Sequence, residues 1–349
     1  MYNRLNLKEN EGFFLTDRVY RRYFSGIDVE EGSILIFKKG IVYFSDARYF
    51  YAVKEKLSKS NIECVLFEGM KSIKTYIENE GLETIYLDYD STTLTENEVY
   101  KGFGVSLQNG SSKLKALCEI KTENEIKNIK KACEIIEKAV NKAFSILKTG
   151  ITEKAVEKFI IDEVLSSGAE GMSFNTIVAF GKNSAVPHHE TDDTELFENQ
   201  AVLIDAGCIV NGYCSDITRT AFYGTPDEEF LQCYEHVKNA NLLCFDTIKE
   251  GYPLKSADAA ARDYLSKAGI GKYFTHSLGH GVGTRIHEEP RLSTSAEGTF
   301  KENMVFTIEP GVYFDGKFGI RIEDTAVLQN NTARRLFSDS KNLRIINIK

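Results

Sequence analysis

The sequence predicts an α+β protein of two domains, a smaller α/β domain over residues 1–118 and a larger domain over residues 119–349. Three observations lead to this prediction. Strand-like and helix-like segments alternate up to about residue 118, which is typical of an α/β layer architecture. The sequence then changes to long amphipathic helices. The order helix, helix, hairpin occurs twice in the second domain, which indicates two similar halves.

The first domain contains the segment GSILIFKKGIVYFSD, which predicts two strands joined near Lys39-Gly40. Helical patterns cover residues 48–57 and 71–78. Residues 83–87 and 105–107 are predicted as short strands. None of these segments carries a motif with catalytic chemistry, so we expect the functional residues to lie in the second domain.

The first half of the second domain opens with a long helix. Thr122 and Glu125 form a predicted capping box, and apolar residues follow at helical spacing from Ile126 to Leu147. A second helix is predicted after Thr152, and a strand-rich stretch follows it.

The second half repeats this order. Thr225 is the predicted N-cap of another long helix, with Pro226 in its first turn and Glu228 in the capping-box position. A shorter helix is predicted after Ser256, and strands with a second hairpin near Gly316 follow.

Composition excludes several classes of protein. The chain has 349 residues, of which 42% are hydrophobic and 27% charged, as expected for a globular protein with a substantial core. A net charge of -8 argues against nucleic acid as the main partner. The seven cysteines are scattered without a CxxC pair and indicate reduced thiols of a cytoplasmic protein. No apolar signal core opens the chain, and no run approaches the ~20 apolar residues of a membrane span.

Five residues in the last 150 or so positions supply four carboxylates and one imidazole. This donor set can hold two divalent cations side by side and leave an open position for water. A single acid is most simply explained as a surface residue, but five such residues in strand-like or glycine-rich segments do not fit that explanation. In chain order they are Asp205 in VLIDAG, Asp216 in YCSDITRT, His280 in HSLGHGVG, Glu309 in VFTIEPG and Glu323 in GIRIEDT.

The first two acids are predicted to share one face of a hairpin. Asn211-Gly212 between apolar runs favours a two-residue turn. Counting back from this turn places Asp205 opposite Thr218, and Asp216 is then a diagonal neighbour of Asp205 on the same face. Diagonal neighbours lie roughly 7–8 Å apart, within reach of one metal pair. A slip of one residue would separate them.

The last two acids are related in a similar way. Glu309 and Glu323 are equidistant from Gly316, so a three-residue turn centred there places them opposite each other. Pro310 cannot donate to a central ladder, so it must lie at an edge or a distortion. Strand alternation places Arg321 on the same face as Glu323.

The apolar neighbours of these acids indicate that the strands are buried. Burying adjacent carboxylates without a counter-charge costs several kcal/mol each. A pair of metal ions provides the compensating charge with the fewest assumptions. The neighbours are Ile204, Ile217, Ile308 and Ile322.

This set of residues, with its local sequences, resembles the pita-bread metallopeptidases. That family contains methionyl aminopeptidases, aminopeptidase P (Xaa-Pro aminopeptidase), prolidase (Xaa-Pro dipeptidase) and the metal-free creatinases. The resemblance is strong over residues 122–330. It is weaker over residues 1–118, where VYRRYFSGID and VYFSDARYFYA look like the creatinase-type N-terminal domain of the prolidase and aminopeptidase P branch.

The resemblance implies a role for each ligand. Asp205 would chelate one metal, Asp216 and Glu323 would bridge both, and His280 and Glu309 would complete the shell of the other. A water or hydroxide between the metals would be the nucleophile, and Glu309 would also shuttle its proton. Mn²⁺ suits a carboxylate-rich site with one imidazole, while Co²⁺, Fe²⁺ and Zn²⁺ stay open.

Further residues match motifs of the family. His188, in NSAVPHHE, corresponds to a substrate-binding histidine, and His287, in RIHEEPR, to one that contacts the scissile carbonyl or the leaving nitrogen. Arg291 falls where some prolidases receive the carboxylate of a dipeptide, although aminopeptidase P relatives can carry arginine there too. His276 and Arg321 would lie behind the ligands, with Arg321 orienting a bridging carboxylate.

The resemblance implies a metal-dependent exopeptidase that hydrolyses the Xaa-Pro bond of small peptides, acting as a homodimer. A methionyl aminopeptidase is the alternative within the class, but those enzymes usually lack the first domain. A creatinase-like enzyme or a peptide-binding protein on the same fold is disfavoured because all five ligand positions are filled.

Overall fold

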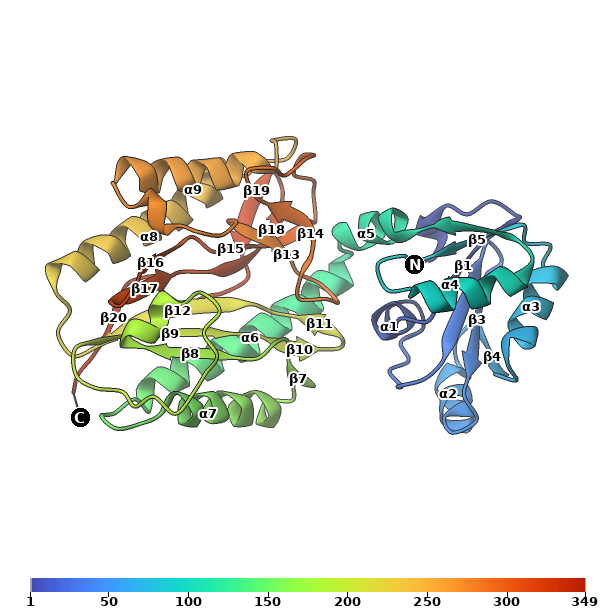
Figure 1. Ribbon diagram of the computed structural model, residues 1–349, viewed down its shortest axis with the longest axis horizontal. Helices are drawn as coiled ribbons and strands as arrows, with labels where there is room; N and C mark the ends of the chain where they lie inside the picture. The colour runs from blue at the N-terminus through green and yellow to red at the C-terminus, as the bar shows by residue number, and fades with distance from the viewer. Residues whose placement is uncertain (1, 349) are drawn as a thin grey trace. The chain divides into compact units, whose positions relative to one another are not determined.

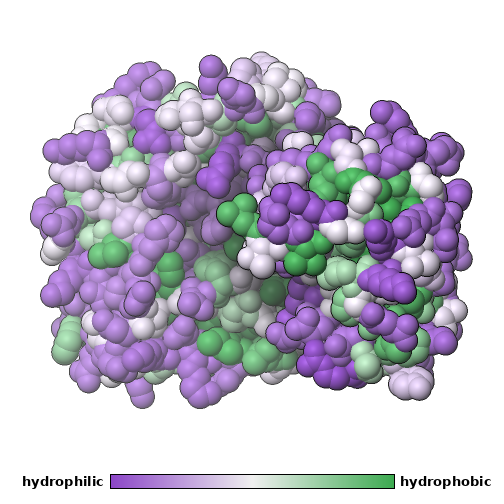
Figure 2. Space-filling view, turned by 45° about the vertical axis from the view of Figure 1, so that its right-hand side comes forward, coloured by the Kyte–Doolittle hydropathy of each residue, from purple (hydrophilic) through white to green (hydrophobic). Residues whose placement is uncertain are grey.

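The computed structural model describes residues 2–348 and divides the chain into two compact units, Met1–Cys118 and Glu119–Lys349 (Figure 1). Among the described residues, no helix has the length and apolar character needed to cross a membrane. No disulfide joins any of the seven cysteines within this part of the chain. Figure 2 shows a face on which hydrophilic residues predominate and hydrophobic residues form small groups.

The first unit is a six-stranded sheet with helices, in the strand order β4-β3-β2-β1-β5-β6. The predicted turn at Lys39-Gly40 is confirmed, because β2 and β3 pair antiparallel across it. The prediction missed β1, α1, β4, α4 and α5; β1 is a short apolar run (EGFFL) without alternation. The strands are β1 (Glu11–Leu15), β2 (Ser33–Phe37), β3 (Gly40–Ser45), β4 (Ile62–Leu66), β5 (Thr84–Leu87) and β6 (Ser106–Asn109). The helices are α1 (Arg18–Ser25), α2 (Phe50–Leu57), α3 (Met70–Asn79), α4 (Leu94–Tyr100) and α5 (Ser111–Glu119).

The first half of the second unit begins with α6 and α7, as predicted. The capping box is present, since Thr122 accepts from Glu125 N and the Glu125 carboxylate accepts from Thr122 N. Thr152 caps α7 through its side chain. The elements are α6 (Glu123–Ser145), α7 (Glu153–Ser166), β7 (Gly171–Met172), β8 (Ile177–Phe180), β9 (Gln200–Ala206), β10 (Cys208–Val210), β11 (Tyr213–Cys214) and β12 (Ile217–Tyr223).

The second half repeats the order, with one correction at its first helix. The N-cap is Asp227 rather than Thr225, because the Asp227 carboxylate accepts from Phe230 N, and the helix begins only at Glu228. The elements are α8 (Glu228–Thr247), α9 (Lys255–Lys267), β13 (Gly279–Gly281), β14 (Glu288–Leu292), β15 (Val305–Ile308), β16 (Gly311–Phe314), β17 (Phe318–Arg321), β18 (Asp324–Gln329) and β19 (Thr332–Arg335). A last strand, β20 (Arg344–Ile346), returns to pair in parallel with β12.

Both predicted hairpin registers are confirmed. Across the first hairpin Asp205 pairs with Thr218, as counted from the turn. In the second, Ile308 pairs with Asp324, and β16 pairs with β17 around Gly316. The second ladder is interrupted between these pairs, at Glu309 and Pro310, where β15 and β16 enter different sheets. The proline therefore lies at a distortion, as its missing N–H requires.

The strands of the two halves lie between two outer layers of helices, α6 and α7 on one side and α8 and α9 on the other (Figure 1). One apolar core packs α6 and α7 against β8, β9 and β12, and a second packs α8 and α9 against β15 to β18. The halves are joined at their centre, where Glu323 N donates to Thr218 O (3.1 Å). This junction brings acids that are about a hundred residues apart in the sequence to the same place.

Candidate metal centre

The predicted ligands from both halves converge. Asp216, His280 and Glu323 present ligand atoms that all lie within 4.8 Å of one another. His280 Nε2 lies 3.6 Å from Asp216 Oδ2 and 3.4 Å from Glu309 Oε1. Asp216 and Glu323 are buried. Asp216, Glu309 and Glu323 lie next to strand ends: Asp216 precedes β12, Glu309 follows β15, and Glu323 lies between β17 and β18.

His280 is held in the orientation of a metal ligand. Its Nδ1 lies 3.1 Å from Gly281 O, so the ring donates there and directs the lone pair of Nε2 toward the acids. Burial and the neighbouring His287 lower the pKa of His280 to about 4, which keeps the imidazole neutral. A side chain at either flanking position would collide with backbone, since a Cβ at Gly279 would lie 2.2 Å from Thr307 O and one at Gly281 2.1 Å from Glu289 O.

Asp205 lies beside this cluster and is only half satisfied. Arg321 Nη2 donates to Asp205 Oδ2 at 2.6 Å. The other oxygen, Oδ1, is buried and has no hydrogen-bond partner among the described residues. Leaving a buried carboxylate oxygen unpaired is costly, so this atom indicates a missing positive ligand.

A threonine hydroxyl contacts each of the two glutamates, Thr218 of β12 for Glu323 and Thr307 of β15 for Glu309. Thr218 donates to Glu323 Oε2 at 2.5 Å, and Thr307 donates to Glu309 Oε1 at 3.1 Å. Thr307 also accepts from His280 N, so one hydroxyl fixes two ligands. These contacts leave the remaining oxygens of both carboxylates available.

The electrostatics of the cluster favour cations. Burial and the charges of the neighbouring acids raise the pKa values of Asp216 and Glu323 well above their usual range. Burial raises the pKa of Glu309 to about 8, although Arg321 opposes this shift. A single arginine therefore does not compensate the four acids. Two divalent cations fit, because the donor set is all oxygen plus one neutral imidazole and Asp205 Oδ1 lacks a partner.

His287, Arg291 and His188 are exposed, and His287 and Arg291 both lie next to His280. The His287 ring packs edge-on against His280, with centroids 4.4 Å apart. Arg291 pairs with His280 across β13 and β14, where a β-bulge follows. Partial burial, Arg291 and His188 lower the pKa of His287, so both residues lie near it.

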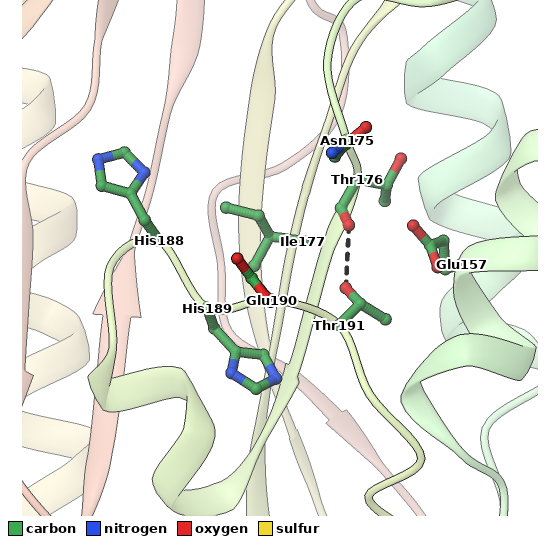
Figure 3. Close-up of a pocket in the computed structure, with 8 residues that line it drawn as sticks. All are labelled: Glu157, Asn175, Thr176, Ile177, His188, His189, Glu190 and Thr191. Atoms are coloured by element: carbon green, nitrogen blue, oxygen red, sulfur yellow. Dashed lines mark hydrogen bonds between the residues drawn. The ribbon is translucent and has the colours of Figure 1, made fainter.

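His188 and His189 project in opposite directions from their segment (Figure 3). With Glu157, Thr176 and Glu190, both histidines line a cavity of ≈ 610 Å³. His188 points away from the side on which His189 lies, so only one of the two adjacent histidines can face the metal ligands.

Arg321 contacts one candidate ligand directly and another through a hydroxyl. Its Nη2 donates to Asp205 Oδ2, and its Nε donates to Thr218 Oγ1 (3.0 Å). Thr218 in turn donates to Glu323, one of the two carboxylates expected to bridge. Tyr313 was not among the predicted site residues. Its hydroxyl accepts from Arg321 Nη1 (2.8 Å) and lies 2.9 Å from His276 Nε2.

Tyr313 lies on β16, beyond the break at Glu309 and Pro310, so strand alternation counted from Glu309 does not reach it. Burial and Arg321 lower the pKa of His276 to about 4. His276 is therefore neutral where it contacts the Tyr313 hydroxyl.

The fold and the site define a class: a hydrolase whose two similar halves enclose a cluster suited to two divalent cations. The model of metallopeptidase family M24 matches residues 127–330. The chain belongs to this metallopeptidase family, and its fold is the pita-bread fold expected from the sequence.

Known relatives agree over nearly the whole chain. An Xaa-Pro dipeptidase of Pyrococcus furiosus is 36% identical over 333 residues, which cover 95% of this chain and 94% of the relative. The structure of an Xaa-Pro dipeptidase from Bacillus anthracis superposes with a TM-score of 0.94 at 31% identity, covering 99% of both chains. An X-Pro aminopeptidase from Thermotoga maritima gives a TM-score of 0.92 at 30% identity, covering 99% of this chain and 100% of that one.

Proposed function

We propose that this protein is a metal-dependent exopeptidase that hydrolyses the Xaa-Pro bond of dipeptides or at the N-terminus of short peptides. The convergence of Asp205, Asp216, His280, Glu309 and Glu323 carries this proposal. Similarity to Xaa-Pro peptidases over both units supports the substrate class and disfavours a methionyl aminopeptidase. The intact ligand set disfavours a creatinase-like or purely binding role.

The five ligands would hold two divalent cations, for which Mn²⁺ is our first choice and Co²⁺, Zn²⁺ and Fe²⁺ are the alternatives. Such cations make water nucleophilic near neutral pH and stabilise negative charge on the carbonyl oxygen. Glu309, with Oε1 held by Thr307, takes the proton of the attacking water and passes it to the leaving imino nitrogen.

The residues around the cluster bind the peptide. His287, packed against His280, donates to the scissile carbonyl or to the leaving nitrogen, and His188 binds the substrate from the other side. Arg291 receives the carboxylate of a dipeptide in a bidentate pair. Arg321 and Tyr313 keep Asp205 in place.

Substrate preference tests this function. The Mn²⁺-loaded protein is expected to cleave Ala-Pro or Ala-Pro-Ala and to leave Ala-Ala intact, as followed by release of proline or of Pro-Ala. Cleavage of Ala-Pro alone would make it a dipeptidase, and a preference for the tripeptide would make it an aminopeptidase. Failure to cleave either peptide with metal bound would exclude the proposed substrate class.

The variant His287→Ala is expected to keep its metal and to lose kcat by about 10²-fold, because it removes one donor to the reacting group. Steady-state kinetics and elemental analysis of the same preparation measure both quantities. Loss of metal together with activity would instead identify His287 as a ligand.

The variant Arg291→Ala is expected to raise KM for Ala-Pro by about tenfold or more and to affect Ala-Pro-Ala much less, since only the dipeptide places its carboxylate there. Kinetics on the two peptides provide the comparison. Equal losses for both would remove Arg291 from the substrate site.

We further infer a cytoplasmic homodimer. Seven cysteines without a disulfide among the described residues support a reducing compartment, and the family resemblance supports the dimer. Light scattering of the purified protein measures the oligomeric state.

A further inference from the structure

One buried carboxylate outside the metal cluster holds together the segment that carries His188. Glu153, the first residue of α7, is fully buried. Its Oε1 accepts from Phe180 N (2.7 Å) and from Asn183 Nδ2 (2.9 Å). Its Oε2 lies 2.7 Å from His189 Nε2 and accepts from Asp192 N (3.2 Å).

These four contacts occupy the acceptor sites of the carboxylate. Their partners lie at the start, middle and end of one segment, residues 180–192. The group is therefore satisfied and does not need a metal ion, although Glu153, His189 and Asp192 lie close enough together to resemble a metal site. The Glu153 carboxylate therefore holds the segment in place through these contacts.

On its other side the segment is held by Arg321, which also contacts one of the candidate metal ligands. Arg321 Nη1 donates to Pro187 O at 3.3 Å, while its Nη2 holds Asp205. The residue between these two attachments, His188, projects in the direction opposite to His189 (Figure 3). Fixing the His189 side chain therefore fixes the direction of His188.

We propose that Glu153 and His189 are positioning residues, which act by orienting His188 toward the substrate of the neighbouring metal centre. This inference rests on the proposed function, in which His188 binds the peptide. A misplacement of about 1 Å can reduce the catalytic rate by 10²-fold. The contact between Glu153 and His189 can therefore have a large effect on kcat/KM although neither residue touches the reacting atoms.

The test compares two amides of different reach at position 189. The amide nitrogen of glutamine can take the place of His Nε2 and donate to Glu153, whereas that of asparagine ends short of it. His189→Asn is expected to lower kcat/KM on an Xaa-Pro peptide by about tenfold or more with unchanged metal content, and His189→Gln to stay within about threefold of the wild type.

Lys154→Met is the matched control. It breaks the exposed ion pair of Lys154 with Asp193 (2.8 Å), which links the same helix to the same part of the chain without contacting Glu153. It is expected to leave kcat/KM unchanged, because exposed pairs contribute little.

A double-mutant cycle shows whether the effect passes through His188. In a His188→Ala background, His189→Asn is expected to cause no further loss of kcat/KM. A full additional loss would mean a merely structural role and would overturn the proposal. Amide hydrogen exchange gives a readout without activity: Phe180 and Asp192 should exchange faster in His189→Asn and not in His189→Gln.

The outcomes separate this proposal from the proposed function. If His188→Ala lowers kcat/KM but His189→Asn does not, the positioning role fails and the peptidase function stands. If His188→Ala leaves kcat/KM unchanged, the role of His188 in binding is wrong and the positioning proposal fails with it.

Discussion

Glu323→Gln is expected to abolish both metal binding and peptidase activity, with kcat reduced by about 10³-fold or more, equivalent to roughly 4 kcal/mol of transition-state stabilisation. Glutamine keeps the shape of the side chain and an oxygen for the Thr218 hydroxyl. It removes one negative charge from the point where Asp216, His280 and Glu323 converge. The loss would therefore reflect charge and ligation rather than packing. Elemental analysis and kinetics on an Xaa-Pro peptide measure the two effects.

The control for this variant is Glu229→Gln, which removes an exposed carboxylate that pairs with Lys317 on the surface of the same unit. It is expected to keep full metal content and activity. Wild-type turnover by Glu323→Gln would contradict the assignment of Glu323 as a ligand. Normal metal content with low activity would restrict its role to the reaction itself.

Arg219→Met is expected to destabilise the second unit by about 3–5 kcal/mol, because it leaves buried acids with less positive charge. Arg219 donates to Asp324 Oδ1 (2.8 Å) and to Asp339 Oδ1 (2.5 Å). The same guanidinium donates to the carbonyl oxygen of Glu323. This network fixes the strand behind the metal ligand, so loss of metal affinity should accompany the loss of stability. Denaturant unfolding followed by circular dichroism measures the change.

Lys317→Met is the matched control, since its ion pair with Glu229 is exposed and should not affect unfolding measurably. An unfolding transition of Arg219→Met that coincides with the wild type would show that the network does not stabilise the unit.

The same network predicts how stability depends on pH. Burial alone would raise the pKa of Asp324, but Arg219, Lys341 and Arg335 outweigh it and hold the pKa well below its usual range. A carboxyl group with a depressed folded-state pKa stabilises the fold above its unfolded pKa of about 3.9, and this contribution is lost as pH falls further. The destabilisation by Arg219→Met should therefore shrink below about pH 4.

Local chemistry explains why much of the site was predictable. The turn at Asn211-Gly212 sets a register that extends back to Asp205 without any distant contact. The turn around Gly316 sets the register of β16 and β17, and the same count holds beyond the break, where Ile308 pairs with Asp324. Capping at Thr122 is likewise encoded within four residues. These features depend only on neighbours in the sequence.

Other features depended on contacts that no local pattern encodes. The N-cap at Asp227 was missed because Thr225, Pro226 and Glu228 also match a cap pattern, and only the observed path of the chain distinguishes them. Arg321 was predicted to lie on the same strand face as Glu323. In the structure it pairs with Asp205, which belongs to the other half of the unit.

The sequence by itself predicted five candidate metal ligands, the registers of the two hairpins that carry four of them, and a repeated order of elements in the two halves. Only the tertiary structure decided that the halves meet at Glu323 and Thr218, that Asp324 anchors the strand from behind, and that Glu153 holds the segment of His188. The physical reason is distance along the chain. Turns and caps are fixed by a few consecutive residues, whereas pairs separated by about 30 to 120 residues form only when both cores have packed.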